Sequence, residues 1–73
     1  MDPASARYLI RINGHLGPTL LSAFPAMASR RQGPDTVLTG ALDRSGLYGL
    51  LAEIEALGLE LLEVQRKPLS DDT

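Results

Sequence analysis

The sequence predicts a single α+β domain in which one antiparallel sheet carries two helices on one face. Three observations lead to this prediction. Segments with the alternating apolar residues of strands stand near both ends of the chain. A capped amphipathic segment, residues 43–57, precedes the last strand, and turn residues separate two further strand-like segments in the middle. The 73 residues leave room for one domain, with flexible ends expected at 1–6 and 68–73.

Composition narrows the class of protein. A hydrophobic fraction of 44% is typical of a globular domain and argues against disorder. The net charge of −2 argues against nucleic acid as a partner, because phosphate contacts use clustered Lys and Arg. With no cysteine and one histidine, His15, we expect no metal site, and no cofactor motif is present. No membrane span or secretory signal is recognisable, so we expect a cytoplasmic protein.

The first strand is expected over residues 7–13. Tyr8, Ile10 and Ile12 fall on one face of this strand, and Arg11 falls on the other. A period of two with aromatic and β-branched residues is typical of a strand with one buried face.

Residues 18–24 allow two interpretations. In a helix, Pro18 would occupy the first position, where its missing N–H costs nothing, and Pro25 would end the element. In a strand, the same residues show no clean alternation. We prefer a short helix of two turns, and a strand remains the alternative.

A hairpin is expected next. Gly33-Pro34-Asp35 is a compact turn signal, and residues 36–42 are rich in β-branched side chains. The preceding segment, 26–32, is a weak strand that includes Arg30-Arg31, so we place it at an edge of the sheet.

The second helix has the clearest pattern in the chain. Asp43 is expected to cap it, and Gly58 is expected to end it in a left-handed conformation. A core-facing stripe follows helical spacing and consists of Leu47, Leu50, Leu51, Ile54 and Leu57. Gly49 is expected to let this helix approach the sheet closely.

The last strand is expected over residues 59–66. Leu62 and Val64 define one of its faces, and Leu59 and Leu61 define the other. Apolar residues on both faces predict a strand that is covered on two sides.

The predicted order is strand, helix, strand, strand, helix, strand. Two right-handed βαβ halves joined by a hairpin give a ferredoxin-like βαββαβ sandwich, with a four-stranded antiparallel sheet and two helices on one face. If residues 18–24 are not helical, the fallback is a βββαβ arrangement.

Candidate ligand-binding residues surround the loop after the first strand. They are Tyr8, Arg11, Asn13, His15, Gly17 and Thr19. Glycines would permit close backbone approach, and free N–H groups from Thr19 onward could bind an anion. The ordinary interpretation is a tight loop, a core-edge aromatic and a solvated charge. No nucleophile with a supporting base is recognisable, so we predict no catalytic residues and no enzyme activity.

Candidate interface residues lie in the last strand. They are Leu59, Leu61 and Glu63. A chain of this length has a small core, and pairing with a second copy would bury more apolar surface. We therefore expect a homodimer.

Two resemblances add to this interpretation. Tyr8-Leu9-Ile10-Arg11-Ile12-Asn13-Gly14-His15-Leu16, residues 36–51 and residues 56–66 together resemble a family of short, uncharacterised proteins of high-GC, actinobacterial-type bacteria with a ferredoxin-like pattern. That resemblance implies a fold and no activity. Gly17-Pro18-Thr19-Leu20-Leu21 is similar in layout to ACT-type regulatory domains, which pair through their sheets and bind amino acids near the first strand–helix loop. Here the loop lacks the acidic residue of that family, and its proline and glycine stand in the other order.

Three functions are compatible with these observations. The leading hypothesis is a non-enzymatic accessory or interaction module that forms a homodimer and serves a larger protein partner. The first alternative is an ACT-like sensor that binds an amino acid or small anion at residues 13–19. The second alternative is a small dimeric ferredoxin-like enzyme that uses His15, Tyr8 or Arg11.

Overall fold

The protein folds as one four-stranded antiparallel sheet with two helices. The structure, a computed structural model, describes residues 5–68, so most of the two predicted flexible ends lies outside the described residues. The elements are β1 (Ala6–Asn13), α1 (Pro18–Leu21), β2 (Ala28–Gln32), β3 (Asp35–Leu42), α2 (Arg44–Ala56) and β4 (Leu61–Pro68). The strand order is β2-β3-β1-β4, and each neighbouring pair is antiparallel. The predicted α+β class is confirmed.

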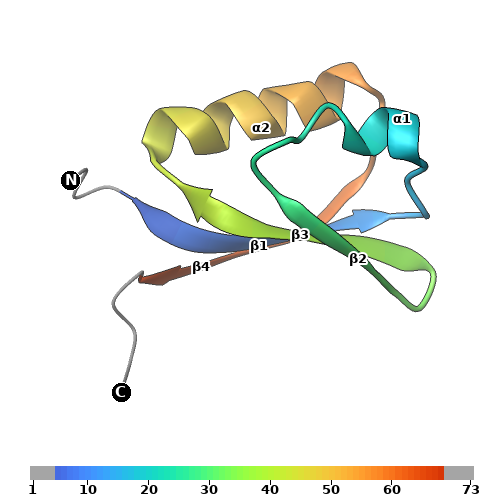
Figure 1. The fold of residues 1–73 in the computed structure, drawn as a ribbon, viewed down its shortest axis with the longest axis horizontal. Coiled ribbons are helices and arrows are strands. Elements are labelled where there is room, and N and C mark those ends of the chain that lie inside the picture. Colours follow the sequence, from blue (N-terminus) through green and yellow to red (C-terminus); the bar gives the residue numbers. More distant parts are fainter. Residues whose placement is uncertain (1–4, 69–73) are drawn as a thin grey trace.

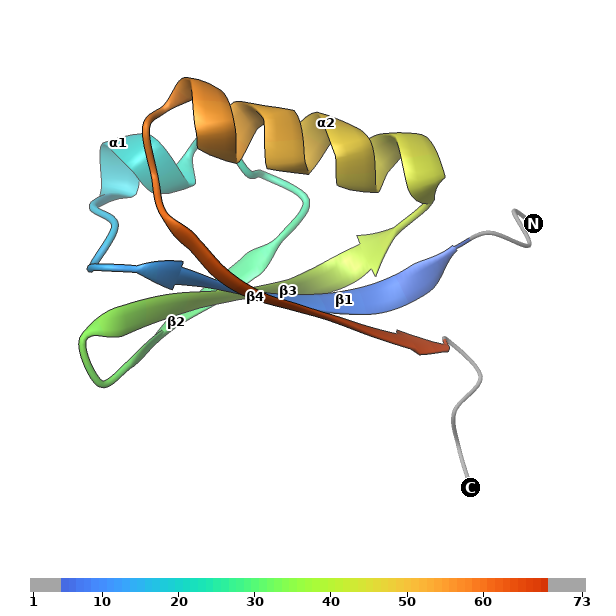
Figure 2. The same ribbon diagram turned by 180° about the vertical axis from the view of Figure 1, so that it is seen from behind.

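The sheet has one covered face and one open face. Both helices lie on the same side of the sheet (Figures 1 and 2), and no helix or strand among residues 5–68 covers the other side. The core lies between the helices and the covered face. Neither helix in this part of the chain has the length and apolar character that crossing a membrane would require.

β1 is an inner strand of the sheet, and one of its faces is buried, as its alternation predicts. It pairs with β3 on one side and with β4 on the other. Tyr8, Ile10 and Ile12 point to the helices and are buried. The strand begins at Ala6, which is also buried and which pairs with both Leu42 and Pro68. The sheet therefore reaches further toward both ends of the chain than the sequence pattern indicates.

α1 is a helix, as preferred, but it has only one turn. Pro18 stands at its start, and the helix ends at Leu21 rather than at residue 24. Phe24 lies beyond the helix and is nevertheless buried in the core. The strand alternative for this segment is wrong, because residues 18–24 contain no strand.

The predicted hairpin is confirmed. β2 and β3 pair around a turn in which Gly33 has a φ of +59°, a conformation that favours glycine. All five residues of β2 are exposed, and β2 is an edge strand, as its two arginines predict. β3 begins one residue earlier than expected, at Asp35.

The close approach expected at Gly49 occurs at a different glycine. A Cβ atom on Gly49 would have nothing within 4 Å, so that prediction is wrong. A Cβ atom on Gly40 of β3 would lie 2.6 Å from Met27 Sδ and 3.0 Å from the Ala26 carbonyl oxygen. Gly40 is needed because the chain entering β2 crosses over this point of the sheet.

α2 follows its predicted pattern except at Leu57, which follows the last helical residue and is exposed rather than core-facing. The Asp43 carboxylate accepts a hydrogen bond from the Gly46 N–H at 2.7 Å and caps the helix. Leu50 and Ile54 are buried, and Leu47 and Leu51 pack against the core. The chain leaves the helix through Gly58, whose φ of +73° is the expected left-handed stop.

β4 differs most from its prediction. It begins at Leu61, and Leu59 instead packs against the core from the preceding loop. Ile12 pairs with Leu61 and Arg11 pairs with Glu63, so Leu62 is an extra residue that forms a β-bulge. Val64 then pairs with Ile10. The predicted faces of this strand are wrong, because strict alternation does not continue across a bulge.

Candidate interaction surface

The open face of the sheet has an apolar centre covered by charged side chains. Arg30, Val37, Arg11 and Glu63 form one row across β2, β3, β1 and β4. Val37 is 0% exposed although it lies on the face without helices. Its cross-strand neighbours are the two arginines, whose apolar stems can cover it while their charged ends stay in water. Arg11 and Arg30 are therefore the residues whose positions allow them to cover Val37.

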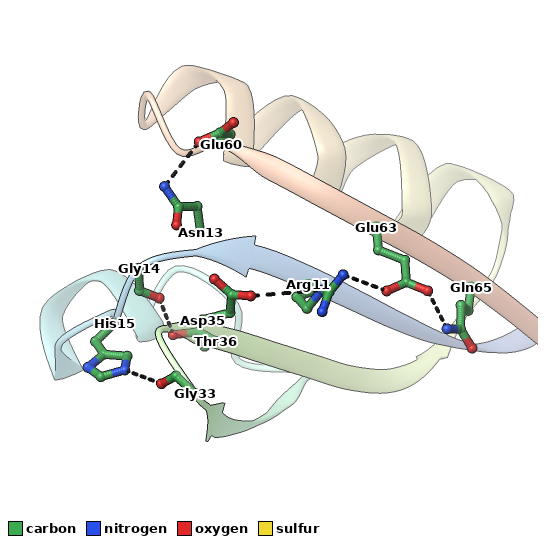
Figure 3. Close-up of polar contacts among 10 residues, drawn as sticks. All are labelled: Arg11, Asn13, Gly14, His15, Gly33, Asp35, Thr36, Glu60, Glu63 and Gln65. Atoms are coloured by element: carbon green, nitrogen blue, oxygen red, sulfur yellow. Dashed lines mark hydrogen bonds and ion pairs between the residues drawn. The ribbon is translucent and has the colours of Figure 1, made fainter.

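Arg11 connects three strands of the open face (Figure 3). Its Nη2 lies 3.3 Å from Glu63 Oε1 in β4, and its Nε lies 4.0 Å from Asp35 Oδ2 in β3. The Gln65 amide donates to the other oxygen of Glu63. The Arg11 Nε is buried and has no hydrogen-bond partner. The Arg11 side chain is 36% exposed, so water screens its ion pair with Glu63.

The loop after β1 is fastened to the β2–β3 hairpin. His15 Nε2 lies 2.9 Å from the Gly33 carbonyl oxygen, to which it donates (Figure 3). The buried Thr36 hydroxyl donates to the Gly14 carbonyl at 2.8 Å and accepts from the Leu16 N–H at 3.2 Å. The polar groups of this loop thus hold the loop against the sheet.

Asn13 is also engaged within the chain. Its side-chain amide donates to Glu60 Oε1 at 3.0 Å, and its backbone N–H donates to the Glu60 carbonyl at 2.9 Å (Figure 3). These two bonds tie the end of β1 to the residue that precedes β4.

The predicted ligand-binding residues do not gather at one point. Tyr8 is buried on the helix side of β1, whereas Arg11 lies on the open face. His15 bonds the hairpin turn. Gly17 and Thr19 are exposed at the start of α1, which has only four residues. Sequence reasoning missed Thr36, whose role depends on a loop about 20 residues away along the chain.

The outer edge of β4 is the most apolar exposed part of the sheet. Leu61 and Leu62 are each 42% exposed, and Val64 is 40% exposed. β4 is an edge strand, so one side of its backbone has no neighbour among the described residues. Of the predicted interface residues, Leu61 lies here, Glu63 lies on the adjoining open face, and Leu59 points into the core. The sequence pattern predicted a strand covered on two sides and therefore missed the exposure of Leu62 and Val64.

Comparison with known proteins places this chain in a family. No curated protein and no solved structure gives a significant match. One family model matches residues 7–65, from β1 through most of β4. The match includes the edge strand β2, the first part of the edge strand β4, the loop that contains His15 and the Arg11 row of the open face. The chain belongs to the family described as Domain of unknown function (DUF8691).

Proposed function

We propose that this protein is a non-enzymatic interaction module that works as a homodimer. The observation that carries the proposal is β4, an edge strand with three apolar side chains that are each at least 40% exposed. An uncovered apolar edge is a hazard for a protein on its own, because it can pair with another chain. Binding of a partner removes that hazard and buries the apolar surface.

The size of the core supports the same proposal. Apart from Val37 on the open face, the buried apolar residues form a single layer between the sheet and the helices, and α1 contributes only one turn to the cover. A chain of 73 residues buries only about 60% of the surface that its unfolded form exposes. Additional burial at an interface would raise the free energy of unfolding.

The fold proposed for the module is ferredoxin-like. The support is the strand order β2-β3-β1-β4, in which β1 and β2 are parallel to each other and are separated by β3. This order agrees with the proposed split βαβ arrangement. Domains of this kind leave one sheet face and two strand edges available for partners.

The internal bonds of the 13–19 loop favour an interaction module over a small-molecule sensor. His15 donates a hydrogen bond to the Gly33 carbonyl, and Asn13 donates one to Glu60. The Thr36 hydroxyl bonds both Gly14 and Leu16. A ligand at this loop would have to replace these bonds.

Sedimentation equilibrium tests the proposal. The protein should sediment with twice the mass of one chain at micromolar concentration and dissociate on dilution. The test variant, Val64→Thr, replaces an exposed apolar residue on β4. The control variant, Ser29→Ala, replaces an exposed residue on β2. Only the first should weaken association. A folded monomer at every concentration would overturn the proposal.

A further inference from the structure

The two edge strands have different charge patterns. β2 contains Arg30 and Arg31 and no acidic residue. β4 follows Glu60, contains Glu63 near its start, and carries Arg66 and Lys67 near its end. The acidic part of β4 thus precedes the basic part.

In a two-fold dimer, the charge pattern of an edge strand decides whether that strand can pair with its own copy. When a strand pairs with its own copy around a two-fold axis, the two strands are antiparallel, and the start of each lies beside the end of the other. Self-pairing of β2 would bring its arginines together. Self-pairing of β4 brings the acidic start of one copy beside the basic end of the other. Charge therefore favours β4 as the self-pairing edge.

We propose that two copies of this chain join through their β4 strands around a two-fold axis at Gln65, giving one continuous eight-stranded sheet. The inference rests on the proposed homodimer and names its interface. Glu63 of each copy then faces Lys67 of the other. Both side chains belong to the open face, because their partners on β1 are Arg11 and Arg7.

The position of the axis follows from the regular part of β4. Residues opposite each other must point to the same face, so the axis passes midway between one residue and the same residue of the other copy. Two features limit regular pairing to residues 63–67. One is the bulge at Leu62, and the other is Pro68, which has no N–H to donate. Gln65 is the centre of that segment. An axis at Val64 would place Glu63 opposite Gln65 and leave the charges without direct partners.

The exposed apolar surface of β4 also favours a second copy of this chain as its partner. Val64 lies within the proposed pairing segment, whereas Leu61 and Leu62 come just before it. Val64 pairs with Ile10 and so lies on the helix side of the sheet. In the proposed dimer it faces the apolar stem of Arg66 from the other copy, which would cover it.

Single cysteines test the axis directly, since the chain has no cysteine of its own. Gln65→Cys places two thiols opposite each other, within the span of a disulfide. Mild oxidation should convert most of this variant to a covalent dimer. Val64→Cys and Arg31→Cys are the controls and should stay mostly monomeric on a denaturing gel, because their copies are too far apart.

Each outcome decides the inference. Faster crosslinking of Val64→Cys than of Gln65→Cys would move the axis and overturn the register. A wild-type dimer in sedimentation without Gln65→Cys crosslinking would overturn the β4 interface and leave the homodimer standing. A monomer in sedimentation would overturn both.

A charge exchange provides an independent test. Lys67→Glu puts two carboxylates opposite each other and should raise the dissociation constant of the dimer about tenfold. Mixing it with Glu63→Lys should form a heterodimer in preference to either homodimer, because both opposite-charge pairs are then restored. Arg31→Glu makes the same change of charge on β2 and should leave the dissociation constant unchanged. Random mixing of the two β4 variants would overturn the pairing.

Discussion

The Thr36 hydroxyl donates to the Gly14 carbonyl at 2.8 Å while it accepts from the Leu16 N–H at 3.2 Å. One buried side chain thereby satisfies two backbone groups of the loop after β1. We predict that Thr36→Val lowers the free energy of unfolding by about 1–3 kcal/mol, because both groups lose their partner. Urea unfolding measures the change. Thr39→Val, on the open face of the same strand, is the control and should change stability by less than about 0.5 kcal/mol.

The two glycines Gly40 and Gly49 should respond to alanine in opposite ways. Gly40→Ala places a Cβ atom 2.6 Å from Met27 Sδ, which can move aside, and 3.0 Å from the Ala26 carbonyl oxygen, which belongs to the backbone and cannot, so we expect a loss of about 1–3 kcal/mol. Gly49→Ala meets nothing within 4 Å in the middle of a helix and should add about 0.5–1 kcal/mol. Thermal and urea unfolding report both changes. Equal effects at the two sites would contradict the packing described for Met27.

Arg11 should matter more for its stem than for its charge. Arg11→Met keeps an apolar stem beside Val37 and loses a screened ion pair, so stability should fall by less than about 1 kcal/mol. Arg11→Ala also exposes Val37 and should cost more than the methionine variant. Chemical unfolding of the two variants side by side makes the comparison. A larger loss of stability in Arg11→Met than in Arg11→Ala would contradict the role of the Arg11 stem in covering Val37.

Binding of free amino acids is not expected at the 13–19 loop. A ligand at 100 times its dissociation constant would add about 2.7 kcal/mol to the free energy of unfolding, which a thermal-shift screen detects easily. We predict no shift with the common amino acids or with phosphate. A positive result that disappears in His15→Ala would restore the sensor hypothesis, and one that survives in this variant would point to a different site.

Local signals predicted β1, the hairpin and α2 well. Alternation over Tyr8, Ile10 and Ile12 and the cap at Asp43 act over a few residues, so the sequence shows them directly. The β4 bulge has no such local signal, because Leu62 is an extra residue only relative to β1. For this reason the faces of the last strand were assigned wrongly.

The candidate site was harder to predict than the fold. His15 has glycine neighbours that fit a ligand loop as well as a structural loop, and the difference depends on Gly33, which lies 18 residues away. The proposed β4 interface depends on which strands lie at the edges of the sheet. Strand order is a property of the whole fold, so the charge pattern of β4 gains meaning only once β4 is known to be an edge.

The pairing of Ala6 with Pro68 has a practical consequence. The chain enters and leaves the sheet at one corner, so a short linker could connect these two positions. A circular permutant with a new opening in the exposed turn at Gly33 and Pro34 should keep the fold. The same corner would allow the whole unit to be inserted into a surface loop of a host protein without spreading the ends of that loop.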